Sequence, residues 1–222
     1  MPAQVNVVET IADSLRSAIS LGELKLGEEV KPAKLAAQFE VSRIPVREAC
    51  KLLEGEGLLV TRSNHRTAVA PLTSGELCEI FELRFLLEDV LIRRAVINLD
   101  DAALERAGFI HRQLGRETKP SRQSALNREF HETLYAPAEA PLMLRLVNQL
   151  RVRVEALQHL HMALMEKTPE FQREHAAILK AASDRNTSKA ATAVRQHLES
   201  AKQIAVAALK KHHSLTAGKG RR

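Results

Sequence analysis

Cysteine, aromatic residues and long apolar runs are all scarce in this chain of 222 residues. The two cysteines, Cys50 and Cys78, stand in no metal-binding motif, which excludes a disulfide framework and a zinc finger. No apolar run approaches the length of a membrane span, and the N-terminus lacks a basic region followed by an apolar core. We therefore expect a soluble cytoplasmic protein without a membrane partner. Tryptophan is absent, whereas alanine, leucine, arginine and glutamate dominate, which favours helices.

The formal net charge of +6 is unevenly distributed along the chain. Residues 1–71 hold nine lysines and arginines against nine acidic residues, so this part is formally neutral. The last thirteen residues hold five basic residues and no acid. We predict that residues 212–222 form a disordered basic tail. Any binding of DNA must then depend on where individual arginines lie, because the bulk charge does not supply it.

A helix with two different faces is predicted to begin after Ser42. Its apolar residues recur at helical spacing, whereas Arg43, Arg47 and Lys51 follow one another four residues apart and share a solvent-facing stripe. The residues expected to delimit this helix are an N-cap serine, a first-turn proline and two terminating glycines: Ser42, Pro45, Gly55 and Gly57.

A shorter helix over residues 32–39 precedes the arginine-bearing helix, and the pair has the order of a helix-turn-helix over about residues 32–51. Two short strands, 58–61 and 67–70, follow around a basic tip and predict a wing. A cationic stripe alone is usually only a solvated face, but this ordered set predicts DNA binding, because arginine can donate two hydrogen bonds to guanine. The predicted DNA-contacting residues are Lys34, Ser42, Arg43, Arg47, Lys51, His65 and Arg66.

Beyond a short linker at residues 71–74 the pattern changes to helices alone. Thr73 or Ser74 can cap the first of them. Six helices with short loops predict an antiparallel bundle. The fold class is therefore mostly α, with a winged helix-turn-helix domain over residues 1–71 and a helical domain over residues 76–211, to which the resemblance described below assigns effector binding and dimerisation. The predicted helices cover residues 75–97, 101–116, 121–135, 140–165, 169–182 and 187–211.

Three histidines and an amide lie on three of these helices. Asn127 and His131 are one helical turn apart, and His175 and His197 belong to the two last helices. Imidazole nitrogens and a carbonyl oxygen suit Zn²⁺, Ni²⁺, Mn²⁺ or Fe²⁺. Spacing alone, however, favours the simpler interpretation of histidines satisfied inside a core. The histidines that we place on the surface of the second domain are His111, His159, His161, His212 and His213.

The chain resembles a known family in both parts. Residues 5–71 resemble the winged-helix domain of GntR-family bacterial transcription regulators, and the matching segments are residues 22–27, 41–49 and 53–58. This resemblance implies that Arg43 and Arg47 read bases or the adjacent phosphates. The wing tip carries Arg66 where relatives often have glycine.

The second part, residues 76–211, resembles the ligand-sensing FCD domain of the FadR-like branch of that family. The resemblance is carried by residues 127–131, 174–175 and 195–198, and it implies a divalent metal held by Asn127, His131, His175 and His197. Many relatives have aspartate at the first of these positions. The neutral Asn127 leaves the site one charge more positive.

Arg84 lies on the inward stripe of the first bundle helix, in a segment, residues 82–88, that also resembles the FCD domain. A buried charge requires a partner. Two partners remain open at this point, Glu88 on the same helix and a carboxylate effector held near the metal.

These observations predict a transcription regulator, not an enzyme. We expect a homodimeric repressor that binds a double-stranded, inverted-repeat operator and responds to a small organic acid chelated by the metal and Arg84. Two alternatives remain. One is a metal-dependent enzyme using the histidine cluster, with Glu174 as the candidate base. The other is a non-catalytic helical adaptor.

Overall fold

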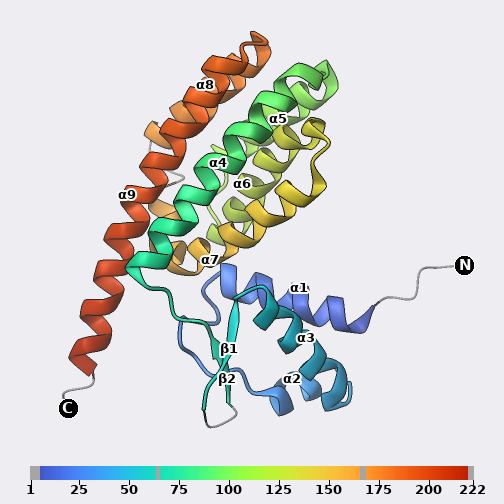
Figure 1. Cartoon of the computed structure of the whole chain (residues 1–222), viewed down its shortest axis with the longest axis vertical. Helices are drawn as coiled ribbons and strands as arrows, with labels where there is room; N and C mark the ends of the chain where they lie inside the picture. Colours follow the sequence, from blue (N-terminus) through green and yellow to red (C-terminus); the bar gives the residue numbers. More distant parts are fainter. Residues whose placement is uncertain (1–5, 64–65, 166–168, 220–222) are drawn as a thin grey trace, which may run out of the picture. The chain divides into compact units, whose positions relative to one another are not determined.

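The computed structural model describes residues 6–63, 66–165 and 169–219 (Figure 1). They form two compact units. The first contains Met1–Leu72 and Val152–Leu157, and the second contains Thr73–Arg151 and Gln158–Arg222. Among the described helices, none combines the length and the apolar character that crossing a lipid bilayer requires.

The first unit is a small helical domain with a two-stranded antiparallel sheet. In the sheet Leu59 pairs with Val69 and Thr61 pairs with Thr67, as expected for the wing. An apolar core unites the elements and also includes Val152. The elements in chain order are α1 (Val7–Ser20), α2 (Pro32–Gln38), α3 (Arg43–Gly55), β1 (Leu59–Thr61) and β2 (Thr67–Val69).

The C-terminal end of α3 is fixed by a glycine in the left-handed conformation. Gly57 has φ +72°, its N–H donates to the carbonyl of Glu54 (3.0 Å), and the N–H of Leu58 donates to Leu53 (2.9 Å). These two bonds form a Schellman motif, which satisfies carbonyls that the helix leaves open. The predicted stop is confirmed.

The N-terminal end of α3 differs from the expectation. Ser42 occupies the N-cap position, but its side chain makes no capping hydrogen bond. Pro45 stands at the third helical position and has no N–H, so one of the two usual donors to a capping oxygen is absent. The exposed Ser42 hydroxyl is thus not used by the helix.

The second unit is an all-helical bundle, as predicted. In it α4 packs along α9, α5 packs against α6 and α8, and α8 packs against α9 (Figure 1). Thr73 caps α4 in a reciprocal capping box with Glu76. The elements are α4 (Ser74–Asn98), α5 (Asp101–Leu114), α6 (Pro120–Tyr135), the 3₁₀ helix η1 (Ala136–Ala138), α7 (Pro141–Met165), α8 (Pro169–Ser183) and α9 (Thr187–Lys219).

The predicted disordered tail is wrong for residues 212–219, which continue α9. No proline or glycine interrupts the segment before Gly218. Charge alone therefore did not justify ending the helix at residue 211.

The orientation of α3 can be tested with two neighbouring leucines. Leu53→Ala removes a fully buried side chain and should lower the free energy of unfolding by about 2–5 kcal/mol. Leu52 is 38% exposed, and Leu52→Ala should change that free energy by less than about 0.5 kcal/mol. Urea denaturation followed by circular dichroism measures both. Equal losses would mean that the two faces of α3 are assigned wrongly.

Candidate functional site

The cationic row of α3 is fully presented to solvent. Arg43, Arg47 and Lys51 are all exposed, and none makes a hydrogen bond or ion pair with any residue that the structure describes. Their orientation follows from the opposite face, where Val46 and Leu53 are completely buried. Successive members of the row are about 6 Å apart along the helix axis. The row can therefore contact a groove or a phosphate chain without first breaking interactions within the protein.

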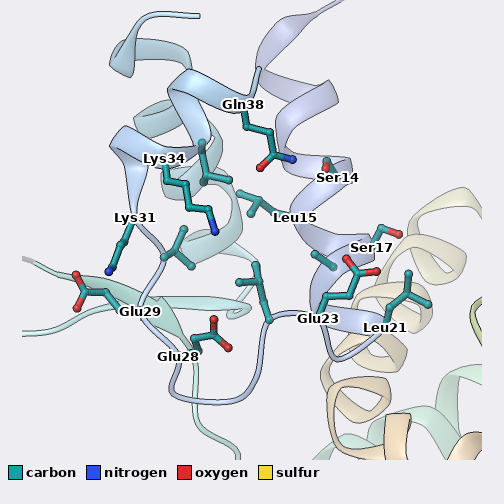
Figure 2. A pocket seen from close by; sticks show the side chains of 14 residues that line it. Ser14, Leu15, Ser17, Leu21, Glu23, Glu28, Glu29, Lys31, Lys34 and Gln38 are labelled. Atoms are coloured by element: carbon teal, nitrogen blue, oxygen red, sulfur yellow. The ribbon is translucent and has the colours of Figure 1, made fainter. Parts of the chain in front are cut away.

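Lys34 lies in a different setting. It lines a hollow of about 590 Å³ between α1 and α2, together with Glu28 and Glu29, and Figure 2 shows its side chain directed into that hollow. Acidic neighbours compete with phosphate for an ammonium group. Lys34 thus remains a predicted DNA contact that would have to turn toward the duplex.

The wing contributes two arginines that contact the rest of the first unit. Arg62 donates to the carbonyl of Gly27 (2.8 Å), and Arg66 forms an ion pair with Glu29 (3.3 Å). The side chain of Arg66 remains 62% exposed, so it can still approach a phosphate. The predicted contact His65 lies outside the described residues.

The structure brings the three predicted histidines together. His131 on α6, His175 on α8 and His197 on α9 are buried, and one ring nitrogen of each lies within 4.8 Å of the others. The imidazole centroids of His175 and His197 are 4.6 Å apart. These distances allow one ion to bind all three nitrogens after small side-chain adjustments.

The cluster is not explained by hydrogen bonding inside a core. Nδ1 of His131 and both ring nitrogens of His175 are buried without a hydrogen-bond partner among the described residues. Each such atom costs about 1–3 kcal/mol. Burial lowers the pKa of His131 and of His175 well below 6.5, so both rings are neutral at pH 7 and have lone pairs for a metal. The residues present therefore fit a divalent ion.

His197 is oriented by a carboxylate. Its Nδ1 lies 3.0 Å from Glu174 Oε2, and the other oxygen of Glu174 accepts a hydrogen bond from Ser200 (2.6 Å). Burial would raise the pKa of Glu174, but the hydrogen bonds from His197 and Ser200 outweigh it and lower that pKa. An ionised Glu174 holds a proton on Nδ1 and leaves Nε2 as the metal-facing atom. Sequence reasoning considered Glu174 only as a catalytic base.

Arg84 is paired with Glu88, one of the two partners considered from the sequence. Both side chains are buried, and Arg84 Nε lies 2.7 Å from Glu88 Oε1. The second oxygen of Glu88 accepts hydrogen bonds from Tyr135 (2.8 Å) and Arg151 (3.2 Å). Burial would raise the pKa of Glu88, yet the two guanidinium groups and the hydrogen bonds from Arg84 and Tyr135 lower it to about 2. Glu88 is therefore ionised, and both of its oxygens accept hydrogen bonds.

His111 was wrongly placed on the surface. It is half-buried, its ring centroid lies 6.0 Å from that of His175, and its Nδ1 is buried without a described partner. The sequence around His111 did not indicate its burial, because only the packing of α5 against α8 brings the rings of His111 and His175 together.

Asn127, one turn before His131 on α6, is half-buried, and its role as a ligand remains a prediction.

The buried histidines make stability depend on pH. Their pKa values are lower in the folded chain than the ordinary value of 6.5, so below pH 6.5 the unfolded chain binds protons that the folded chain does not. The contribution of these two histidines to the free energy of unfolding is complete above pH 6.5. Below pH 6.5 it decreases by up to about 1.4 kcal/mol per histidine for each pH unit. We expect the metal-free melting temperature to drop between pH 7.5 and 5.5, and to drop less in the double variant His131→Gln, His175→Gln. Equal drops would contradict the assignment.

Comparisons with known proteins match both units. The model of bacterial regulatory proteins of the gntR family matches residues 7–69, and the FCD domain model matches residues 79–200. The uncharacterized HTH-type transcriptional regulator YdhC of Bacillus subtilis is 27% identical, over 83% of this chain and 84% of the relative. A probable D-xylose utilization operon transcriptional repressor of Paenarthrobacter nicotinovorans is 31% identical over 68% of each chain.

A solved structure supports the fold. The structure of E. coli McbR/YncC gives a TM-score of 0.81, covers 95% of this chain and 100% of that one, and is 23% identical. The FCD match alone spans more than half of the present chain. The winged domain with its exposed arginine row and the helical bundle with its histidines are therefore those of a DNA-binding transcriptional regulator, and the chain belongs to the FadR-like, FCD-containing branch of the GntR family.

Proposed function

We propose that this regulator is a homodimeric repressor that binds an inverted-repeat operator, and that a small organic acid controls it through a divalent metal in the helical unit. The observation that carries the proposal is the buried histidine cluster, in which Nδ1 of His131 and both ring nitrogens of His175 lack hydrogen-bond partners among the described residues. A core without a ligand would not retain them at that cost. The name of the Paenarthrobacter relative supports repression as the sign of control.

The charges around the histidine cluster support an organic acid as the proposed ligand. Arg84 and Arg151 both act on His131 in the direction that lowers its pKa, which places their positive charge near the metal ligands. An anion bound to the metal would lie in the same positive field. Arg84 would contribute to that field while keeping its bond with Glu88.

The homodimer is supported by an exposed apolar row on α4. Leu83, Leu86 and Ile97 are 48%, 66% and 72% exposed, and the half-buried Val90 lies between them at helical spacing. An apolar row of this kind on a charged helix is typical of an interaction surface. A second copy of the chain, related by a two-fold axis, would cover both rows at once and would present two α3 helices to two half-sites.

The enzyme alternative loses its candidate base. Both oxygens of Glu174 are engaged, one with His197 and the other with Ser200. These contacts favour a role for Glu174 in orienting the imidazole of His197 over a role as a base.

Operator recognition should depend on Arg47. DNA selected from a genomic pool by the full-length protein should contain an inverted repeat, and Arg47→Ala should weaken binding to it by roughly 1–3 kcal/mol, because a base or phosphate contact is lost. Mobility-shift titration at fixed salt measures the affinity. Arg122→Ala removes the same charge from an exposed position on α6 and should leave the affinity unchanged. Unchanged affinity in Arg47→Ala as well would count against α3 as the reading helix.

Metal binding should follow the three imidazoles and their carboxylate. The double variant His131→Ala, His175→Ala should retain no Zn²⁺ after dialysis, as measured by elemental analysis. Glu174→Gln should weaken Zn²⁺ binding about 10- to 100-fold, because His197 loses its orienting charge. The matched control is His111→Ala, which removes a neighbouring imidazole outside the cluster and should still bind Zn²⁺. Retention of metal by the double variant would place the ion elsewhere.

A further inference from the structure

The most exposed large apolar residue described in the first unit belongs to the helix that carries the cationic row. Ile44 is the second residue of α3 and is 68% exposed. It takes no part in the apolar core of that unit. Single exposed apolar residues are common on protein surfaces, so exposure alone assigns no role to it. Isoleucine is also a weaker helix former than alanine or lysine, so helix propensity does not account for its presence either.

Ile44 points directly away from the core of the first unit. Successive residues of an α-helix are rotated by about 100° around its axis. With this rotation, Ile44 lies within roughly 10° of the direction opposite to the mean direction of the buried residues. The cationic row lies on one side of Ile44 and Glu48 lies on the other. Ile44 is therefore at the centre of the face that α3 would present to a groove. The buried residues of α3 are Val46, Ala49, Cys50 and Leu53.

The side chains at the centre of this face are not suited to a phosphate. Ile44 is apolar, and the exposed Glu48, one turn further along α3, has the same sign of charge as the DNA backbone. Contacts with phosphate would therefore fall to the cationic row. Residues at the N-terminal end of a reading helix are the ones that contact base edges in helix-turn-helix proteins. The position and the chemistry of Ile44 both favour a contact with a base.

One base offers an apolar group to such a side chain. The 5-methyl group of thymine projects into the major groove, whereas adenine, guanine and cytosine present hydrogen-bonding groups there, which isoleucine cannot satisfy. Ile44 precedes Arg47 by three residues, so their Cβ atoms are about 5–6 Å apart. This distance corresponds to one or two base-pair steps of about 3.4 Å.

We propose that Ile44 determines operator specificity by packing against the methyl group of a thymine, within about two base pairs of the position that Arg47 contacts. This role rests on α3 being the helix that enters the major groove, and it adds a base preference that a row of cations does not supply. Covering one apolar group of methyl size changes affinity by about 4-fold. The protein would therefore favour thymine at one position of each half-site.

Replacement of thymine by deoxyuridine tests the contact, because it removes the 5-methyl group and leaves base pairing unchanged. The full-length protein selects its operator from a random DNA pool, and each thymine of the selected operator is then replaced in turn. We expect one thymine per half-site at which deoxyuridine weakens wild-type binding about 4-fold, as measured by fluorescence anisotropy at fixed salt. If no thymine shows this loss, the proposed role of Ile44 is overturned.

The variant Ile44→Ala identifies the side chain that makes the contact. It should bind the thymine and deoxyuridine operators equally well, because alanine does not reach the methyl group. The matched control is Leu52→Ala, which removes an exposed apolar side chain two turns further along α3 and should retain the 4-fold difference of the wild type. A preference for thymine that persists in Ile44→Ala would assign the contact to another residue and overturn the proposal.

Failure of this role can be distinguished from failure of α3 as the reading helix. If Arg47→Ala weakens operator binding while deoxyuridine has no effect, α3 still reads the DNA and only the contact of Ile44 is refuted. If neither change alters the affinity, α3 is not the helix in the groove, and both assignments fail. The circular dichroism spectrum of each variant should match that of the wild type, since Ile44 and Arg47 are exposed.

Discussion

The burial of imidazole and guanidinium groups in a helical bundle is the constraint on which the second unit depends. His131, His175 and Arg84 all lie below 7% exposure, in surroundings made mostly of leucine, isoleucine, valine and alanine. Arg84 satisfies its charge through Glu88, which is held ionised by two arginines and a tyrosine. The two histidines have no comparable partners among the described residues. The bundle thus combines a buried ion pair with a histidine cluster in which three buried ring nitrogens have no hydrogen-bond partner among the described residues.

In the first unit, the cationic side chains of α3 have no partners among the described residues, while the opposite face of the helix is anchored in the core. Completely buried Val46 and Leu53 fix the rotation of α3, so the opposite face with Arg43 and Arg47 must point to solvent. Lys34 differs from this row, because it shares a hollow with Glu28 and Glu29.

The hydrogen bond between Glu174 and His197 places a negative charge beside the imidazole and orients its ring. A carboxylate next to a metal-binding imidazole increases its basicity and fixes its tautomer, while it stays one atom layer removed from the ion. The site therefore gains orientation without direct charge compensation. Under the proposed function, an external anion bound to the metal would give a metabolite a physical means of altering the protein.

The amino-acid sequence by itself determined most of the local structure. Helical periodicity with caps such as Thr73 placed five of the six bundle helices to within two residues at each end, and the start of the sixth. The order of short helix, arginine helix and hairpin identified the winged unit. The prediction failed at residues 212–219, because the net charge of a segment says little about whether its backbone can continue a helix. Spacing along one helix also related Asn127 to His131, since residues four apart share a face.

Only the tertiary structure decided which distant side chains meet. Sequence spacing could not choose between separate core histidines and one cluster, because the convergence of α6, α8 and α9 depends on how the helices pack. The same packing brought Tyr135 and Arg151 to Glu88, turned Glu174 toward His197 and brought His111 beside His175. Helical periodicity fixes the face on which a side chain lies, whereas the neighbour that it meets there is set by contacts between residues far apart in the chain.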